Sequence, residues 1–205
     1  NDLENPSFFI PDPWTETDPD NSWFSTAIYK VLAQTVNENS SGKITLKSYA
    51  ILLLAIVRFA KVKNYGTYLQ LALKSMRKKW NKALFLDLFL YDLFVSLKHK
   101  HQPNFSVLFL NSFAHIQHHY YFNSEFYLGG FKNPDWYCKA GEDPILDALR
   151  VYDKIVGEIM KDSHASIIAT GLQQVPFDDQ KYYYRLNNHE EFLGKLGFVD
   201  FKVYP

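Results

Sequence analysis

The sequence predicts an α/β fold, a three-layer sandwich with a mostly parallel sheet and a helical insertion. A short run rich in Val, Leu and Phe at residues 105–110 is typical of a buried strand. Apolar runs at residues 166–169 and 199–204 follow segments with helical spacing. Because strands then alternate with helices, we expect one sheet with helices packed on its faces.

The first half of the chain predicts one strand followed by several helices. Residues 7–10 form a brief apolar run that ends at Pro11 and Pro13, which predicts the first strand. The helices predicted after it span residues 23–36, 47–62, 65–80 and 84–98. The second of them is apolar on nearly all sides, so we expect it to be buried. We interpret residues 21–100 as a helical insertion or cap within a single domain of residues 1–205.

The second half predicts two more helices and an edge strand. One helix begins at Asp143 and Pro144, where proline occupies the favoured first position. Residues 182–186 alternate between polar and apolar side chains, as in a short edge strand. Residues 189–196 are predicted to form a short helix that Gly197 caps.

Composition excludes several classes of protein. Lys plus Arg and Asp plus Glu total 22 each, and this neutral balance argues against a nucleic-acid-binding surface. The single Cys138 cannot form an internal disulfide. The most apolar run, residues 49–57, is well short of the roughly 20 residues that span a bilayer. We therefore expect a cytoplasmic protein with no membrane span and no nucleic-acid partner, and the start at Asn1 suggests a fragment of a longer chain.

Three histidines, His115, His118 and His119, follow the predicted strand at residues 105–110. Ligands of open α/β sheets gather at the carboxyl ends of strands, and imidazole is the commonest transition-metal ligand. The three residues are therefore candidate ligands of a divalent metal, zinc or manganese. On a helix, His119 diverges from His118 by about 100°, so we expect His115 and His118 to face the cleft. The alternative is a hydrogen-bonded cluster that holds the strand end in place.

Two residues at other predicted strand ends are candidate catalytic groups. Asp12 follows the first predicted strand, and Thr170 follows the strand predicted at residues 166–169. Asp12 belongs to an acidic loop with Asp18 and Asp20, whose carboxylates suit metal binding or acid–base chemistry, and the Thr170 hydroxyl can face a ligand. Asp12 is also the preferred carboxylate partner of the histidines, with Glu125 as a second choice. The alternative for Asp12 is helix capping, and for Thr170 it is a strand-exit turn.

Residues 74–82 carry five basic side chains at the end of a predicted helix. Such a run usually forms a solvated helix end, where cations suit the helix dipole. The alternative is a contact for a phosphate or an acidic lipid head group.

Residues 143–170 resemble a region of the alkaline phosphatase superfamily, in its phosphodiesterase and sulfatase-like branches. The resemblance rests on the pattern Tyr-Asp-Lys-Ile-Val-Gly at residues 152–157, on a helix before the predicted strand. His118, with Gln117 before it and Tyr120 after it, is similar to a metal-ligand histidine of that superfamily. The sequence departs from the superfamily at Ala114, where an Asp would stand, and at Thr170-Gly171, where an Asp-His pair would stand.

The resemblance implies an active site at the strand ends of an α/β/α sandwich. It implies a metal-dependent hydrolase or transferase that acts on a phosphate or sulfate ester of a small molecule or glycan. The alternative is a non-catalytic binding module that retains the cleft and binds a carbohydrate or a protein partner.

Overall fold

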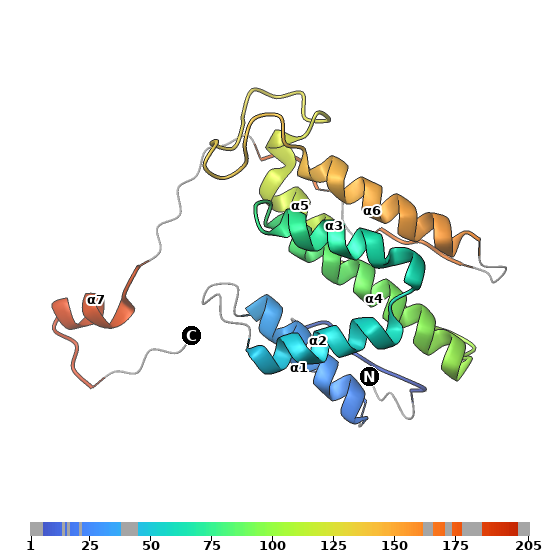
Figure 1. The fold of residues 1–205 in the computed structure, drawn as a ribbon. Helices are drawn as coiled ribbons and strands as arrows, with labels where there is room; N and C mark the ends of the chain where they lie inside the picture. The colour runs from blue at the N-terminus through green and yellow to red at the C-terminus, as the bar shows by residue number, and fades with distance from the viewer. Residues whose placement is uncertain are drawn as a thin grey trace. The chain divides into compact units, whose positions relative to one another are not determined.

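The computed structural model describes residues 6–13, 15, 17–20, 22–37, 45–161, 166–170, 174–177 and 186–200, and every regular element within these ranges is a helix. The chain divides into two compact units, Asn1–Leu172 and Gln173–Pro205. The helices of the first unit are α1 (Trp23–Asn37), α2 (Leu46–Phe59), α3 (Tyr65–Ser75), α4 (Trp80–His101), α5 (Ser112–Tyr120) and α6 (Pro144–Ile159), shown in Figure 1. Two 3-10 turns, η2 (Val62–Asn64) and η3 (Tyr121–Asn123), precede α3 and follow α5.

The second unit contains α7 (His189–Lys195), close to the helix predicted at residues 189–196. Asn188 caps its first turn, because the side-chain oxygen accepts a hydrogen bond from the N–H of Glu191 (3.0 Å). Gly197 follows the helix with a φ of 84°, a left-handed conformation that favours glycine at a helix end.

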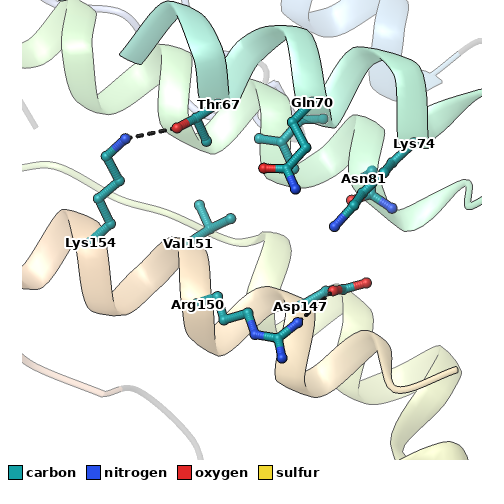
Figure 2. A pocket seen from close by; sticks show the side chains of 9 residues that line it. Thr67, Gln70, Lys74, Asn81, Asp147, Arg150, Val151 and Lys154 are labelled. Carbon is teal, nitrogen blue, oxygen red and sulfur yellow. Dashed lines mark hydrogen bonds and ion pairs between the residues drawn. The ribbon is translucent and has the colours of Figure 1, made fainter. Parts of the chain in front are cut away.

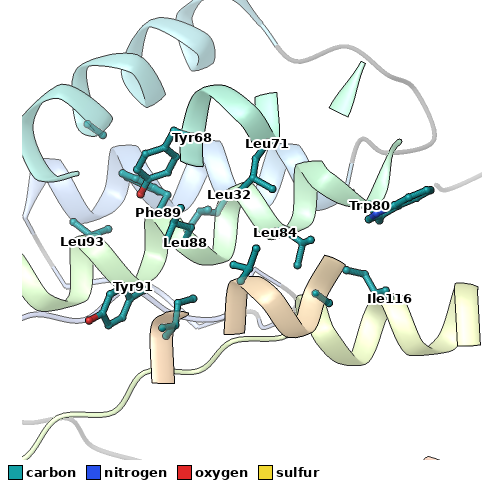
Figure 3. Packing of buried hydrophobic residues seen from close by; sticks show 14 of the residues in the cluster. Leu32, Tyr68, Leu71, Trp80, Leu84, Leu88, Phe89, Tyr91, Leu93 and Ile116 are labelled. Carbon is teal, nitrogen blue, oxygen red and sulfur yellow. The ribbon is translucent and has the colours of Figure 1, made fainter. Parts of the chain in front are cut away.

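Helix α4 is the centre of the first unit. It packs against α2, α3, α5 and α6, and ten of its residues are buried. Leu84, Leu88 and Phe89 have no exposed surface. Figure 3 shows them among side chains of the neighbouring helices, including Tyr68 and Ile116. Burying this much apolar surface around one helix stabilises the unit without a sheet.

Two helix starts follow from local sequence. Thr45 caps α2, because its hydroxyl accepts a hydrogen bond from the N–H of Ser48 (3.2 Å). Asp143 caps α6 in the same way through the N–H of Leu146 (3.0 Å), and Pro144 fills the first helical position. The predicted start of α6 is therefore confirmed.

Asp92 is a fully buried carboxylate that ties α3 and the turn before it to α4. It accepts hydrogen bonds from Asn64 Nδ2 (2.8 and 3.0 Å), from the Tyr68 hydroxyl (3.0 Å) and from the N–H of Lys61 (3.0 Å). Burial and the charge of Asp92 raise the pKa of Tyr68, which keeps that hydroxyl a donor. Four donor contacts replace the water that Asp92 loses on folding.

Asp87, five residues earlier on α4, ties α5 and α6 to the same helix. Its Oδ2 accepts a hydrogen bond from the N–H of Ser112 (3.1 Å) and another from the Tyr152 hydroxyl. The same hydroxyl accepts from the N–H of Phe113 (3.2 Å). Burial raises the pKa of Asp87. The two carboxylates of α4 thus fix helices on both sides of it.

The predicted three-layer α/β sandwich is wrong, because the described residues contain helices and no strand. Residues 105–110 form no regular element, and the described residues contain no strand that could pair with them. Phe105, Val107 and Phe109 are exposed, whereas Leu108 and Leu110 pack against the helical core. The alternation is that of an extended chain lying on a surface, and periodicity alone does not separate this from a strand.

The strands predicted at residues 7–10 and 166–169 are not found. The other two predicted strands lie wholly or mostly outside the described residues. Residues 7–10 pack partly against the core without forming a strand, and residues 166–169 are exposed. Residues 182–185 and 201–204 lie outside the described ranges. The helices predicted within residues 21–100 are the body of the first unit, rather than an insertion into a sheet.

Helix α2 is less buried than the sequence predicted. Only Ser48 and Ala55 are buried, and Leu53, Leu54 and Val57 are 63%, 69% and 66% exposed. The prediction that this helix is buried on nearly all sides is therefore wrong. No helix in the part of the chain that the structure describes has both the length and the apolar character needed to cross a bilayer.

Candidate functional site

A cavity of about 250 Å³ lies between α3 and α6, with α4 beneath it. Both helices pack against α4, and the cavity occupies the space between them. We call it the α3–α6 cavity, and it is lined by Thr67, Gln70, Leu71 and Lys74 of α3, Asn81 of α4, and Asp147, Arg150, Val151 and Lys154 of α6. Seven of these nine residues have polar or charged side chains, which is unusual between packed helices.

The two walls have the same spacing. Positions 67, 70, 71 and 74 on α3 and positions 147, 150, 151 and 154 on α6 follow the i, i+3, i+4, i+7 pattern of one helix face. Each wall has an apolar residue at its third position and a lysine at its fourth. Figure 2 shows the two faces opposite each other.

Helix α6 provides two cations and the one carboxylate of the lining. Lys154 donates a hydrogen bond to the Thr67 hydroxyl (2.8 Å) across the cavity. Asp147 accepts from Trp80 Nε1 (3.0 Å) and forms an ion pair with Arg150 (3.6 Å). The Arg150 side chain is 67% exposed, so it stands at the mouth of the cavity. Its guanidinium has five donors, and one ion pair leaves most of them available.

Helices α3 and α4 line the other end of the α3–α6 cavity. Lys74 points toward the cavity beside Asn81 in Figure 2. Asn81 is 1% exposed, and its Nδ2 donates to the Lys78 carbonyl (3.1 Å). Its Oδ1 has no hydrogen-bond partner among the described residues. A buried acceptor without a partner costs about 1–3 kcal/mol, so a ligand that donates a hydrogen bond here gains affinity.

The charge of the lining favours an anion. Lys74, Arg150 and Lys154 carry three positive charges and Asp147 carries one negative charge, which leaves two in excess. The lining contains no His, Cys or Glu, and its one carboxylate is held by Trp80 and Arg150. The arrangement can therefore hold an anionic group, but it offers no evident general base or nucleophile partner.

The predicted histidines lie on α5, away from the lining of this cavity. The rings of His115 and His119 pair, with centroids 4.6 Å apart. Residues four apart on a helix diverge by about 40° and residues three apart by about 60°, which explains the contact of His115 with His119. The orientation of His115 and His118 toward a cleft stays a prediction. His119 Nδ1 also lies 2.7 Å from the Tyr137 hydroxyl.

The predicted metal site does not assemble in the described residues. No group of three or more His, Cys, Asp or Glu side chains there is arranged to hold a metal. Asp12 lies in a turn in which its carbonyl accepts from the N–H (3.0 Å) and hydroxyl (2.8 Å) of Thr15. Thr170 is exposed, in a segment with no regular structure. Zinc or manganese binding by His115, His118 and His119, and catalysis by Asp12 and Thr170, stay predictions.

Cys138 and two tyrosines next to the histidines are poor nucleophiles. Cys138 is 2% exposed, and burial raises its pKa to about 11, with Glu142 contributing. Burial and the neighbouring Tyr137 raise the pKa of Tyr120 to about 12. These groups stay protonated at neutral pH, which suits packing rather than covalent chemistry.

The histidine pair predicts a pH dependence of stability. Lost hydration and neighbouring histidine charge lower the pKa of His115 and His119 below 6.5, so the unfolded chain takes up protons more readily. The contribution of these two histidines to the free energy of unfolding is complete above about pH 6.5. It is lost as the pH falls toward their lowered pKa values. We expect the urea midpoint to fall between pH 7.5 and pH 5.5, and the fall to be smaller in the double variant His115→Gln, His119→Gln. Exposed His99→Gln is the control, and a slope that the double variant leaves unchanged would contradict this explanation.

Comparisons with known proteins give no family. No family model, no curated protein and no solved structure matches the chain. The function is therefore argued from the α3–α6 cavity and its chemistry.

Proposed function

We propose that the chain is a non-catalytic binding module whose α3–α6 cavity holds a small phosphate ester that carries hydroxyl groups. The observation that supports this most directly is the convergence of Lys74, Arg150 and Lys154 on one cavity with a single, already engaged carboxylate. Charge-assisted hydrogen bonds from Arg and Lys are the usual means of holding phosphate oxygens.

The volume of the cavity and the unpartnered Asn81 oxygen restrict the kind of ligand that fits. About 250 Å³ is below the roughly 300–1,000 Å³ of sites for drug-sized ligands, so a phosphate with a short polyol chain suits it. A hydroxyl of that chain can donate to Asn81 Oδ1, which has no other described partner. Inorganic phosphate fills only the cationic part of such a site.

Hydrolysis of a phosphate or sulfate ester, which the superfamily resemblance implied, has less support. It depended on strand ends that the described residues do not form. The contact in the cavity that most resembles a nucleophile and base is Thr67 with Lys154. Lys154 donates to the hydroxyl in that contact, so it supplies positive charge instead of removing a proton.

Calorimetric titration with glycerol 3-phosphate tests the proposal. We expect binding to the wild type, and at least a tenfold loss of affinity in Arg150→Gln and in Lys154→Gln, because each removes a hydrogen bond to a charged group. Asn81→Leu is expected to weaken glycerol 3-phosphate and to leave inorganic phosphate unchanged. The control is Lys132→Gln, an exposed lysine outside the cavity.

Two results would contradict the proposal. If Lys132→Gln weakens binding of glycerol 3-phosphate as much as Arg150→Gln does, the binding is general charge attraction and not binding in the cavity. Turnover of p-nitrophenyl phosphate that is lost in Thr67→Val would favour the hydrolase.

A further inference from the structure

Helix α2 exposes an apolar face that helices of this composition normally bury. Leu53, Leu54 and Val57 lie on one side of it and are 63–69% exposed. The opposite side, with Ala55, packs against α1 and α4. A helix that is apolar all round belongs in a protein core or in contact with lipid. We therefore expect something outside the described helices to bury the exposed side of α2.

Helix α3 exposes a second apolar stripe. Leu69, Leu73 and Met76 are 63%, 60% and 82% exposed and recur at helical spacing. In Figure 1, α2 lies in front of α1 and α3 lies in front of α4, and each packs against the helix behind it. We call the surface formed by Leu53, Leu54, Val57, Leu69, Leu73 and Met76 the α2–α3 face.

The segment of the chain that carries the α2–α3 face has charges of one sign. Between Glu38 and Asp87 the chain carries ten Lys or Arg residues and no Asp or Glu. Exposed Lys47 and Arg58 border the apolar side of α2, and exposed Arg77 follows the apolar side of α3. An apolar stripe with a cationic edge is the pattern of helices that lie in a membrane interface.

Some of these cations are neutralised within the unit. Glu158 pairs with Lys63, and Glu142 pairs with Lys78 at 3.4 Å. Exposed Lys79, which precedes α4, and exposed Lys82, in its first turn, have no ion-pair partner among the described residues. The segment that carries the face therefore keeps an excess of positive charge after these two pairs are formed.

We propose that the α2–α3 face docks on the surface of an anionic lipid bilayer. Charge complementarity decides the occupant, because a second copy of the chain would place its own cations against these and repel them. With only 14 residues, α2 is too short to span, so it would lie in the plane of the interface. This proposal rests on the α2–α3 face and does not depend on ligand binding in the α3–α6 cavity.

Sedimentation with vesicles tests this docking. We expect the protein to pellet with vesicles of 70% phosphatidylcholine and 30% phosphatidylserine, and much less with pure phosphatidylcholine. Each cation near an anionic surface contributes about fivefold in affinity, so Arg77→Gln with Lys79→Gln should weaken binding about 25-fold. Leu54→Gln and Leu73→Gln should also weaken it, and both positions are exposed, so folding is preserved. Leu128→Gln, 96% exposed outside the face, is the matched control.

Several results would overturn the proposal. Protein that stays in the supernatant with phosphatidylserine vesicles would do so, as would equal loss of binding in Leu128→Gln. A dimer in light scattering that Leu54→Gln breaks would assign the face to a second copy. Capture by polyglutamate without vesicle binding would assign it to an acidic protein.

Discussion

Replacing Asp92 with alanine is expected to lower the free energy of unfolding by about 3–5 kcal/mol, a large share of the roughly 5–15 kcal/mol of a typical domain. The carboxylate is fully buried and accepts from Asn64, from Tyr68 and from the N–H of Lys61. Its removal leaves three buried donors without an acceptor, each costing about 1–3 kcal/mol. These donors lie on α3 and in the residues just before it, so the contact of α3 with α4 is the one that we expect the substitution to weaken most.

Urea unfolding followed by circular dichroism at 222 nm measures this loss. The matched control is Asp153→Ala on α6, where the side chain is exposed, and we expect a change within about 0.5 kcal/mol there. An Asp92→Ala protein as stable as the control would show that the buried network does not hold α3 on α4.

Leu88→Ala is expected to cost about 2–5 kcal/mol. Leu88 has no exposed surface and lies at the centre of α4, where a smaller side chain leaves a cavity. Leu53→Ala makes the same chemical change at a site that is 63% exposed, and we expect less than 1 kcal/mol there. Because Leu88 lies in the core around α4 and Leu53 lies on an exposed side of α2, equal losses at the two sites would contradict the fold described here.

Helices were predictable because their signals are local. The Asp143-Pro144 start of α6 needs only a side-chain oxygen and a fixed φ angle, and both act within one turn. The bounds of α4 were less accurate, since it begins at Trp80 and ends at His101 instead of covering residues 84–98. Its ends depend on packing against α3, α5 and α6, which no local pattern contains.

Strands were not predictable because a strand needs a partner elsewhere in the chain. Residues 105–110 have the composition and alternation of a strand, yet Leu108 and Leu110 pack on helices. The fold class followed from this and the other predicted strands, and so did the expectation that Asp12, His118 and Thr170 lie at strand ends.

The cavity was missed although part of its signal was visible. Lys74 stood in the basic run at residues 74–82, for which a phosphate contact was one alternative. The matching spacing of positions 67–74 and 147–154 becomes a signal only once α3 and α6 are known to face each other. The Asn81 oxygen could not be recognised from sequence, because its lack of a partner depends on the folded packing.

The most direct test of the proposed site is a two-dimensional ¹H–¹⁵N spectrum of the labelled protein during titration with glycerol 3-phosphate. Binding in the α3–α6 cavity predicts shifts of the amides of residues 67–74, of Asn81 and of residues 147–154. Shifts confined to His115, His119 and Tyr137, or no saturable shift at all, would contradict it.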